Sequence, residues 1–395
     1  MTAAAPGFLE LMPDTSTALF ALVVLLTGLH VLSAALTAWR VIRRPEPTSP
    51  PADHTGSVTL LRPVCGLDPN DETTLGSTFR LADHPDLEIV FCAGRESDAA
   101  VPLVRRLVAE NPHVRARLLV GDERPTSNPK LNNLVKGWHG TTGTWVIMAD
   151  SNVLLPPDYV SELMDAYRAD TGLVCSPPVG CAPRGWAAEI ECAFLNTYQA
   201  RWQIAADTIG FGFAQGKSML WRRDLLDAAG GIEALGVDAA EDAAATKIVR
   251  AGGRRVRLVD RPYPQPLGRR SLKEIWDRQV RWARLRRATF PIYYLPEILT
   301  GAAVPFAALA VAAPDLGLHP LTAVTTLAAF WYATELALAK VAGWHISPWA
   351  PVAFVLRDLM LPAVWIEGLT GNGFNWRGNE MSASLSISGA RHRQT

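Results

Sequence analysis

The chain has 395 residues, a length that allows one large domain with additions or two domains. Its 38 Lys and Arg residues equal its 38 Asp and Glu residues in number, which argues against a nucleic-acid-binding protein that depends on overall charge. Hydrophobic residues make up 49% of the chain, and their excess lies near its two ends.

The N-terminal region is predicted to anchor the protein in a membrane. Residues 18–39 are almost uninterruptedly apolar and are about long enough to cross a bilayer as a helix. Arg40, Arg43 and Arg44 follow this stretch directly, whereas a cleavable signal peptide would carry its positive charge before the apolar segment. By the positive-inside tendency, we expect residues 1–44 to form a transmembrane anchor with the rest of the chain beginning in the cytoplasm.

A Pro-rich segment at 45–57 is predicted to be a linker, and strand-like and helix-like stretches alternate after it. Apolar or β-branched runs indicate strands at 57–64, 87–94, 115–121 and 145–150, and helix-like stretches include 98–110 and 157–169. This alternation predicts an α/β, Rossmann-like domain with a mostly parallel sheet covered by helices. The sequence contains neither a GxGxxG dinucleotide turn nor a Walker phosphate loop, so those two nucleotide folds lose weight.

Acidic residues follow several of the predicted strands. Asp68, Asp98 and Asp150 come after strand-like runs, and Glu241 and Asp242 open a helix-like stretch. Taken singly, each is more often a helix cap or a solvated loop acid than a ligand. Together they predict one crevice at the carboxyl edge of the sheet, where ligands of open α/β sheets bind. Oxygen ligands of this kind suit Mg²⁺ or Mn²⁺ on a diphosphate.

Asp242 is expected to behave differently from the strand-end acids. It lies in the first turn of its predicted helix, where the helix dipole favours the ionised carboxylate. A general base must be deprotonated at the working pH, so this position suits proton abstraction.

The segment at 269–291 is strongly basic and has the periodicity of a helix. Arg278, Arg281, Trp282 and Leu285 fall on one face of it. Two interpretations stay open at this point. The helix could bind anionic lipid at the membrane surface, or two arginines could hold a departing diphosphate while the tryptophan packs beside an acceptor.

Further apolar stretches follow near the C-terminus, at 298–313, 321–341 and 351–369. The first is short for a membrane span and could be interfacial or half-crossing. Glu335, Arg357 and Asp358 lie within these stretches. Ionisable groups at membrane depth are usually paired. Because Arg357 and Asp358 are sequence neighbours, we expect them to need separate partners, and we favour a structural role over a lipid-headgroup site.

Several motifs resemble those of a known family. The order Asp150, then Glu241-Asp242, then Arg278-x-x-Arg281-Trp282 resembles the D…ED…(Q/R)xxRW signature of processive and lipid-directed family 2-type glycosyltransferases. More closely, the chain resembles ceramide glucosyltransferases of glycosyltransferase family 21 from about residue 58 to about residue 290. The segments that carry this resemblance are RPVCGLDPN, NPKLNNLVKG, GFGFAQGKSMLWRRDLLDAAGG and AEDAAATKIVRAGG, with NWRGNEM near the C-terminus.

The resemblance implies a GT-A fold and a division of the chain into parts. A cytoplasmic catalytic domain at 58–268 is followed by an amphipathic interface region at 269–296, transmembrane or membrane-associated helices at 297–372, and a tail at 373–395. The implied reaction is an inverting transfer of glucose from UDP-glucose to the primary hydroxyl of ceramide in the membrane, with Mn²⁺ or Mg²⁺ as cofactor. A nucleic-acid partner is not expected, and the oligomeric state is not predicted.

The resemblance also implies roles for individual residues. The nucleotide-sugar site would comprise Asp68, Asp98, Lys130, Asp150 and Glu241, with the metal at Asp150. The catalytic residues would be Asp242 as base, together with Arg278, Arg281 and Trp282. Asn152 departs from the acidic or glycine residue that relatives often carry two places after the metal-binding Asp, which implies a metal held loosely or by Asp150 alone. The segment EDAAA replaces an aromatic-containing EDY, which leaves the acceptor open.

Other activities compete with this one. The enzyme could transfer from UDP-glucuronate to ceramide, or from UDP-N-acetylglucosamine or another UDP-hexose to diacylglycerol or a hopanoid-type lipid. A processive polysaccharide synthase would need a longer membrane channel than these C-terminal stretches supply. A catalytically inactive lipid-binding scaffold is a different class of protein, and the intact acidic and RxxRW motifs argue against it.

Overall fold

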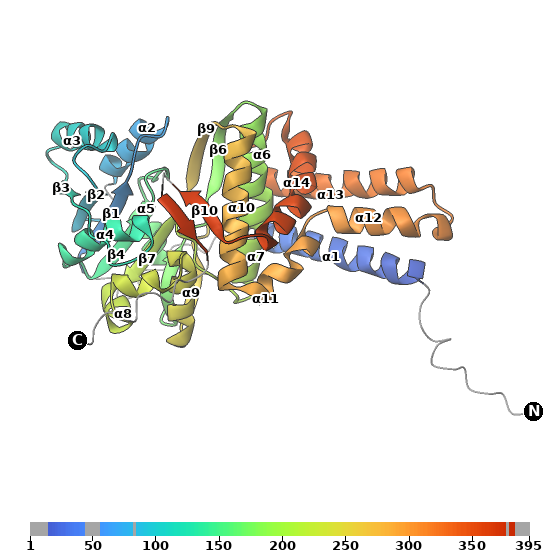
Figure 1. The fold of residues 1–395 in the computed structure, drawn as a ribbon, viewed down its shortest axis with the longest axis horizontal. Coiled ribbons are helices and arrows are strands. Elements are labelled where there is room, and N and C mark those ends of the chain that lie inside the picture. The colour runs from blue at the N-terminus through green and yellow to red at the C-terminus, as the bar shows by residue number, and fades with distance from the viewer. Residues whose placement is uncertain (1–14, 44–55, 82–83, 377–378, 384–395) are drawn as a thin grey trace, which may run out of the picture.

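A computed structural model describes residues 15–43, 56–81, 84–376 and 379–383. The predicted linker at 45–57 lies mostly outside the described residues, as do the first part of the predicted anchor and most of the predicted tail. A sheet domain occupies one end of the molecule and a group of long helices extends from it toward the other end (Figure 1).

The sheet domain is built on a seven-stranded sheet of order β3-β2-β1-β4-β7-β5-β8. Its strands are β1 (Val58–Val64), β2 (Leu87–Ala93), β3 (Ala116–Val120), β4 (Trp145–Ala149), β5 (Thr171–Cys175), β7 (Ser218–Arg222) and β8 (Arg255–Leu258). Only β7 runs antiparallel to its neighbours, β4 and β5, among the paired strands of this sheet. The four predicted strands and the mostly parallel sheet are therefore confirmed.

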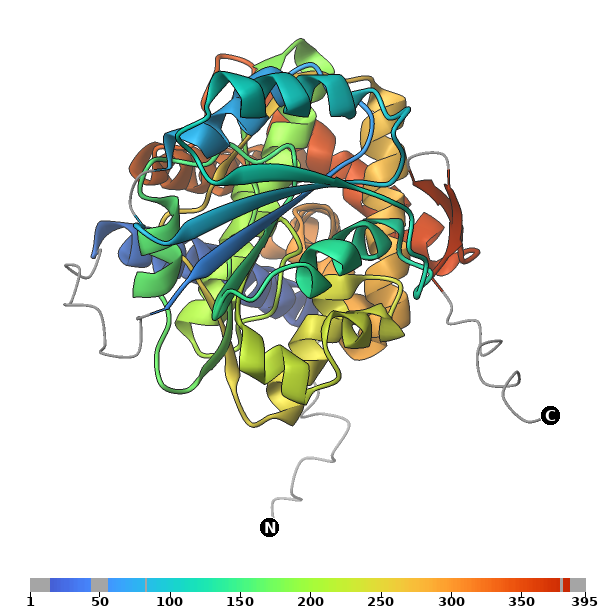
Figure 2. The same ribbon diagram turned by 90° about the vertical axis from the view of Figure 1, so that its left-hand side faces the viewer.

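Helices cover both faces of this sheet, as Figure 2 shows. Alternate residues of a strand point to opposite faces. In β2, Val90 and Cys92 therefore join the core beneath α4 (Pro129–His139), while Ile89 and Phe91 join the core beneath α3 (Ala100–Glu110). Both faces are apolar because both are covered, as is usual for parallel strands. The remaining helices of this domain are α2 (Asp71–Gly76), α5 (Tyr159–Asp165), α8 (Arg223–Ala228) and α9 (Glu241–Ala251).

A second layer joins the sheet domain to the long helices. It contains a parallel pair of short strands, β6 (Val179–Arg184) and β9 (Pro264–Arg269), and a continuous helical segment of α6 (Trp186–Ala193), a π-helix (Phe194–Ala200) and α7 (Arg201–Thr208). The predicted basic helix is α10 (Leu272–Thr289), which begins at a capping box between Ser271 and Glu274. Such a box satisfies backbone N–H groups that a helix start leaves unpaired.

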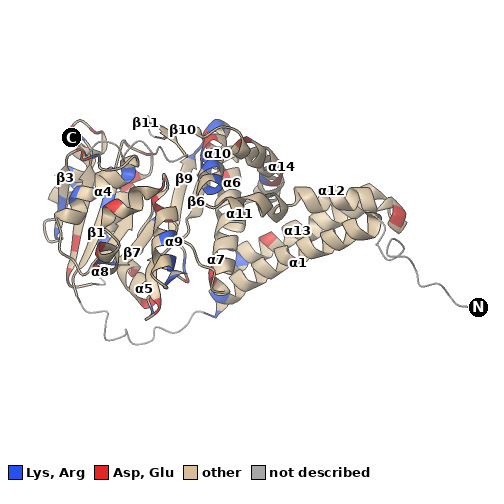
Figure 3. Cartoon of the chain, turned by 60° about the horizontal axis from the view of Figure 1, so that its bottom comes forward, with Lys and Arg blue, Asp and Glu red and all other residues tan. Residues whose placement is uncertain are grey.

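Three helices lie side by side and project away from the sheet domain (Figure 1). They are α1 (Thr15–Ile42), α12 (Ala303–Ala312) and α13 (Pro320–Ala342). Among the described residues, α1 and α13 are long and apolar enough to cross a membrane, and Pro291–Thr300 with Ala303–Ala312 forms a pair bent by 53° that would make a third span. Figure 3 shows that these helices carry few charged residues along their length. The chain is a membrane protein.

The third predicted C-terminal stretch behaves differently. It forms α14 (Ala350–Leu369), which has Pro362 in its interior, carries Arg357, Asp358 and Glu367, and is not among the candidate membrane spans. Instead of joining the projecting bundle, α14 packs against α10 and α6. It therefore lies on the same side of the bundle as the sheet domain.

Arg357 and Asp358 share a single buried network, so the expectation that they need separate partners is wrong. The Arg357 guanidinium, only 1% exposed, contacts both carboxylate oxygens of Glu335 at 2.8 and 2.9 Å and those of Asp358 at 3.0 and 3.1 Å. The planar guanidinium has five N–H donors and can serve two carboxylates at once. The expected structural role is in keeping with this position, because the network joins α13 to α14.

The anchor helix α1 is attached to the sheet domain through polar contacts near its C-terminal end. Arg40 forms ion pairs with Asp207 and Asp260, the latter at 2.8 Å, and donates to the carbonyl of Leu258 at 2.5 Å. Further along α1, His30 stacks on Trp331 of α13 with ring centroids 3.7 Å apart. The anchor is thus fixed to both the bundle and the domain.

Candidate active site

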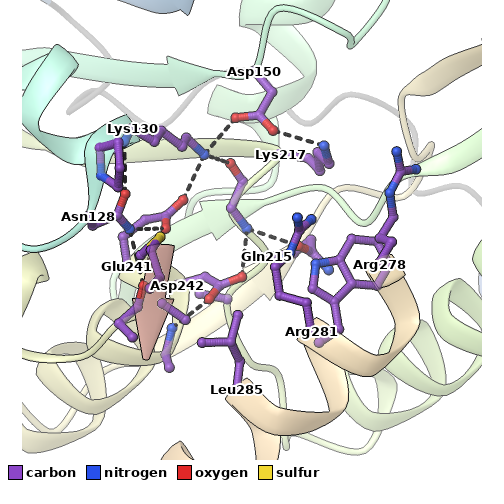
Figure 4. Close-up of a pocket in the computed structure, with 18 of the residues that line it drawn as sticks. Asn128, Lys130, Asp150, Gln215, Lys217, Glu241, Asp242, Arg278, Arg281 and Leu285 are labelled. Carbon is purple, nitrogen blue, oxygen red and sulfur yellow. Dashed lines mark hydrogen bonds and ion pairs between the residues drawn. The ribbon is translucent and has the colours of Figure 1, made fainter. Parts of the chain in front are cut away.

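A cavity of about 1250 Å³ lies where β1, β2 and β4 end, and α10 forms its opposite wall. Figure 4 shows the acidic and lysine side chains on one side and the α10 side chains facing them. All of the predicted site residues line this one cavity: Asp68, Asp98, Lys130, Asp150, Glu241, Asp242, Arg278, Arg281 and Trp282. Their convergence was expected from the strand ends, and their chemical roles stay predictions.

A buried arginine fixes the turn that carries Asp150. Arg62, on the neighbouring strand β1, donates to the backbone carbonyls of Asp150 at 2.8 Å, Ser151 at 3.1 Å and Val153 at 3.0 Å. Its other terminal nitrogen donates to the carbonyl of Thr74 at 3.0 Å. The side chain is fully buried, so these carbonyls replace the water that a charged group would otherwise require. The apolar strand can therefore end in a rigid polar turn.

Two lysines flank the Asp150 carboxylate. Lys130 Nζ lies 2.6 Å from one carboxylate oxygen, and Lys217 Nζ lies 2.9 Å from the other. Lys217 is close because β7 runs antiparallel to β4, which places the start of one strand beside the end of the other. The backbone N–H of Asp150 accordingly donates to the carbonyl of Lys217 at 3.0 Å.

The same lysines determine the ionisation of Asp150. Burial by itself raises the pKa of this carboxyl, but Lys130 and Lys217 outweigh burial and hold the pKa below its usual range. Burial likewise opposes the charge of Lys130, yet Asp150 and Glu241 raise its pKa above the usual value. Both groups are therefore charged at neutral pH.

Glu241 connects this cluster to helix α9. Its side chain accepts from Lys130 Nζ at 2.7 Å and from Asn128 Nδ2 at 2.9 Å. Asn128 is also the N-cap of α4, where its side-chain oxygen accepts from the backbone N–H of Lys130 at 2.9 Å and Leu131 at 3.2 Å. One asparagine thus caps the helix that carries Lys130 and positions the carboxylate that Lys130 contacts.

The pKa of Asp242 is raised above the ordinary value of a carboxyl group. The carboxylate accepts from the backbone N–H of Gly216 at 3.1 Å and from that of Ala243 at 2.9 Å. Burial and the neighbouring charge of Glu241 nevertheless raise its pKa to about 6, against the direction in which the helix dipole acts. Desolvation and a like charge outweigh the two hydrogen bonds. At pH 7 the carboxylate is still mostly ionised, and it is a stronger base than an exposed Asp.

Asp98 organises the backbone at the far end of the cavity. Its Oδ1 accepts from the N–H of Gly66, in the loop after β1, and from the N–H of Ala100 at the start of α3, both at 2.9 Å. Asp68 lies in the same loop, where its own N–H donates to Asp71 at 2.8 Å. These contacts hold the two strand-end loops together around the cavity.

The α10 residues share one face as predicted, and Arg278, Arg281, Trp282 and Leu285 all line the cavity. Arg278 also forms an ion pair with the buried Glu191 of α6, which fixes the helix against the second layer.

The remaining arginines of α10 are engaged within the protein. Arg284 pairs with Glu367 at 2.6 Å, and Arg286 pairs with Glu297 at 2.6 Å. Arg287 donates to the carbonyl of Gly371 at 2.9 Å. These contacts disfavour the interpretation of this helix end as a lipid-binding basic patch.

The cavity lining next to α11 (Pro291–Tyr294) is rich in aromatic side chains and also contains the Arg286–Glu297 ion pair. The aromatic residues are Phe290, the N-cap of α11, and Tyr293 and Tyr294 within that helix. The adjacent Ile292 is 76% exposed, and Leu295 is 58% exposed. This segment is the first half of the bent pair with α12, so these exposed apolar side chains form an apolar rim at the start of a candidate membrane span.

A C-terminal hairpin completes the cavity wall. It consists of β10 (Gly373–Trp376) and β11 (Asn379–Ser382), which pair antiparallel. Phe374 and Met381 line the cavity, and Arg284 of α10 donates to the carbonyl of Gly373 at 2.6 Å. Met381, the last residue of the NWRGNEM segment, thus lies at the site, and Arg377 and Gly378 are outside the described residues.

The chain offers a limited set of metal ligands. Asp150 and Asn152 both direct a side-chain oxygen to Lys217 Nζ, at 2.9 and 3.2 Å. Two oxygen donors that face one point fit a hard divalent cation whose remaining positions are taken by diphosphate and water. Within the described ranges, no group of three or more His, Cys, Asp or Glu side chains is arranged to hold a metal ion.

Several site residues were not singled out from the sequence, namely Arg62, Asn128, Glu191 and Lys217. Asn128 and Lys217 lie in the motifs NPKLNNL and GFGFAQGKS, and their place in these motifs could have indicated that they belong to the site. Arg62 within an otherwise apolar strand was a second signal, because a buried charge requires partners.

Comparisons with known proteins agree with this geometry. The family model described as "Glycosyl transferase family 21" matches residues 18–386. Ceramide glucosyltransferase 1 of Caenorhabditis elegans is 25% identical over 364 residues, which cover 90% of this chain and 77% of the relative. The ceramide glucosyltransferase of Komagataella phaffii is 30% identical over 302 residues, covering 61% and 58%.

Among solved structures, a mannosyltransferase from Pyrobaculum calidifontis in complex with GDP-mannose and Mn²⁺ matches with a TM-score of 0.52 and 22% identity. The match covers 89% of this chain and 99% of that structure, and it confirms the predicted GT-A fold. Because the family match extends over most of its length, the chain belongs to glycosyl transferase family 21.

Proposed function

We propose that this glycosyltransferase transfers glucose from UDP-glucose to the primary hydroxyl of ceramide with inversion at the anomeric carbon. One observation carries the proposal. Asp150 and Asp242 line a single cavity that carries charged side chains at the strand ends and aromatic side chains where it meets α11. A nucleotide sugar suits the charged end and a lipid acceptor suits the aromatic end, and the names of the relatives favour glucose and ceramide.

The donor diphosphate would bind beside Asp150. Lys130 and Lys217 supply positive charge there, and Arg281 faces them from α10. Asp150 and Asn152 would hold a divalent cation, Mn²⁺ or Mg²⁺. Such a cation would stabilise the negative charge of the diphosphate leaving group.

Asp242 would act as the general base. Its carboxylate accepts the proton of the ceramide hydroxyl as that oxygen forms a bond to the anomeric carbon. On the opposite face, the bond from this carbon to UDP breaks and its electron pair leaves on the diphosphate. No covalent sugar–enzyme intermediate is required. The raised pKa of about 6 suits this role, because base catalysis is most efficient when the pKa lies near the working pH.

The membrane helices would bring the cavity to the acceptor. Removing a lipid chain from the bilayer costs about 0.8 kcal/mol for each exposed CH₂ group, so the enzyme has to reach the hydroxyl at the bilayer surface. The exposed Ile292 and Leu295 beside the cavity supply an apolar rim for this contact.

The catalytic domain would lie in the cytoplasm, as the arginines after α1 indicate. Both α10 and α14 pack on the domain side, so the chain between them would cross the membrane an even number of times. The bent pair with α12 followed by α13 supplies two crossings, which would return the C-terminus to the cytoplasm.

The test is the purified full chain in lipid vesicles, offered UDP-glucose, UDP-glucuronate and UDP-N-acetylglucosamine with ceramide or diacylglycerol, and products identified by mass. Glucosylceramide as the main product supports the proposal. A glucuronosyl or N-acetylglucosaminyl lipid would show that the donor is a different UDP-sugar. A diacylglycerol product would show that the acceptor is not ceramide. The Asp150→Ala variant should lose the difference in UDP affinity measured with Mn²⁺ and with EDTA.

A further inference from the structure

The Asp150 carboxylate is compensated from both sides by lysines whose surroundings differ. Lys130 Nζ contacts Asp150 at 2.6 Å, Glu241 at 2.7 Å and the carbonyl of Gly216 at 2.5 Å. Three such contacts match the three N–H donors of an ammonium group. Lys130 is therefore held firmly in the wall of the cavity, with a side chain only 8% exposed.

Lys217 is held less completely and lies nearer to solvent. Its side chain is 16% exposed, and its Nζ contacts Asp150 Oδ2 at 2.9 Å and Asn152 Oδ1 at 3.2 Å. These two oxygens are also the candidate ligands for a divalent cation. A divalent cation that binds both oxygens would occupy the place of the Lys217 ammonium group, so the two cannot be bound there at the same time.

We propose that Lys217 is an exchangeable cation of the donor site. In the metal-free enzyme it occupies the position between Asp150 and Asn152, and it binds the donor diphosphate directly when the donor enters. It therefore competes with a divalent cation for Asp150 while supporting donor binding that does not require the metal. This inference rests on the proposed function, since it assumes that the cavity takes a nucleoside-diphosphate sugar.

Chain flexibility and charge support the exchange. The lysine side chain has a compact, rotatable ammonium group on four methylene groups, which lets it move between neighbouring anions without backbone change. Asn152 supplies a neutral oxygen, so the position between Asp150 and Asn152 carries one formal negative charge rather than two. One ammonium group can neutralise it, whereas a pair of carboxylates would favour a divalent ion more strongly.

The experiment measures binding by the full chain in detergent, without acceptor. In the first arm Mn²⁺ is titrated without nucleotide, and Lys217→Met should bind Mn²⁺ about tenfold more tightly than the unchanged chain because a competing charge is gone. In the second arm UDP is titrated in EDTA, and the same variant should bind UDP about tenfold more weakly because a charge-assisted contact is lost.

Two further variants control these measurements. Lys247→Met removes the lysine of another ion pair, with Asp238 at 2.9 Å, outside the cavity lining, and both affinities should stay within about twofold. Lys217→Arg retains the charge and should restore UDP binding in EDTA to within about threefold of the unchanged chain. Tighter Mn²⁺ binding by Lys217→Met in the first arm shows that its loss of UDP binding is not a failure to fold.

Each outcome decides the proposal. Opposite changes of the two affinities in Lys217→Met support it. Unchanged UDP affinity in EDTA would show that Lys217 is only a counter-ion of Asp150 and does not bind the diphosphate. Unchanged Mn²⁺ affinity would show that Lys217 does not compete with the metal. If the unchanged chain bound no UDP under either condition, the proposed function would fail as well, whereas normal UDP binding with an unexpected product would affect the proposed substrates alone.

Discussion

The backbone N–H of Gly216 donates to Oδ2 of Asp242 at 3.1 Å, which attaches the first turn of α9 to the segment that precedes β7. A side chain at Gly216 would have its Cβ 2.7 Å from Glu241 Oε1 and 3.5 Å from Asp242 Oδ2. Only glycine lets this backbone approach both carboxylates. The carboxylate of Asp242 is therefore oriented by the main chain and retains lone pairs for an incoming hydroxyl group.

Asp242→Asn should lower the rate of sugar transfer by about 10²- to 10⁴-fold, because an amide cannot accept the hydroxyl proton as a base does. UDP affinity should change little, and both quantities are measured on the same preparation by product formation and UDP titration. Asp224→Asn is a matched control, since Asp224 lies in the first turn of α8 and is exposed. Transfer retained by Asp242→Asn would exclude Asp242 as the base.

The pH dependence follows from the raised pKa of Asp242. The base is active only when ionised, so kcat/KM should rise with pH through about 6 and level off above it. Protonation below this value removes the base, and the acid limb should be absent from the residual activity of Asp242→Asn. An acid limb near the ordinary carboxyl pKa of about 4 would contradict the effect of burial and Glu241.

Arg62→Met should destabilise the protein and weaken donor binding together. The substitution leaves the buried carbonyls of Asp150, Ser151 and Val153 without their donor, and we expect the free energy of unfolding to fall by about 3 kcal/mol. Arg80→Met, at an exposed arginine, should change it by less than about 0.5 kcal/mol. Chemical unfolding measures the first effect and UDP titration the second. A stable Arg62→Met variant with normal UDP affinity would show that the turn after β4 does not depend on this side chain.

Ile292→Asp tests the apolar rim as the route of the acceptor. A charge at this exposed position should raise KM for ceramide in vesicles by about tenfold, because the apolar contact with lipid is lost, and should leave UDP affinity unchanged. Val237→Asp places the same charge at an exposed valine outside the cavity lining and should not alter KM. If both substitutions changed KM for ceramide equally, the acceptor would not enter over the apolar rim.

Much of the catalytic face could be predicted because it depends on local sequence. Apolar runs marked the strands, and parallel strands bring their carboxyl ends to one edge, so Asp98 and Asp150 had to approach each other. The four α10 residues followed from helical periodicity alone. The direction of β7 could not be read in this way, and it is the direction of that strand that places Lys217 beside Asp150.

The ionisation of the buried acidic residues could not be predicted from the sequence either. The position of Asp242 in a helix predicted a favoured carboxylate, but the depth of burial and the closeness of Glu241 determine its pKa. The same holds for Arg357 and Asp358, whose shared network forms only when α13 and α14 pack together.

The sequence by itself determined the family, the strands and helices, and the acids that meet at the sheet edge, since each of these follows from short-range patterns. Tertiary structure decided which charges neighbour which, because pairing across elements depends on strand direction and helix packing that no local pattern records. Those pairings set the pKa of the proposed base and bring Lys217 to the position between Asp150 and Asn152.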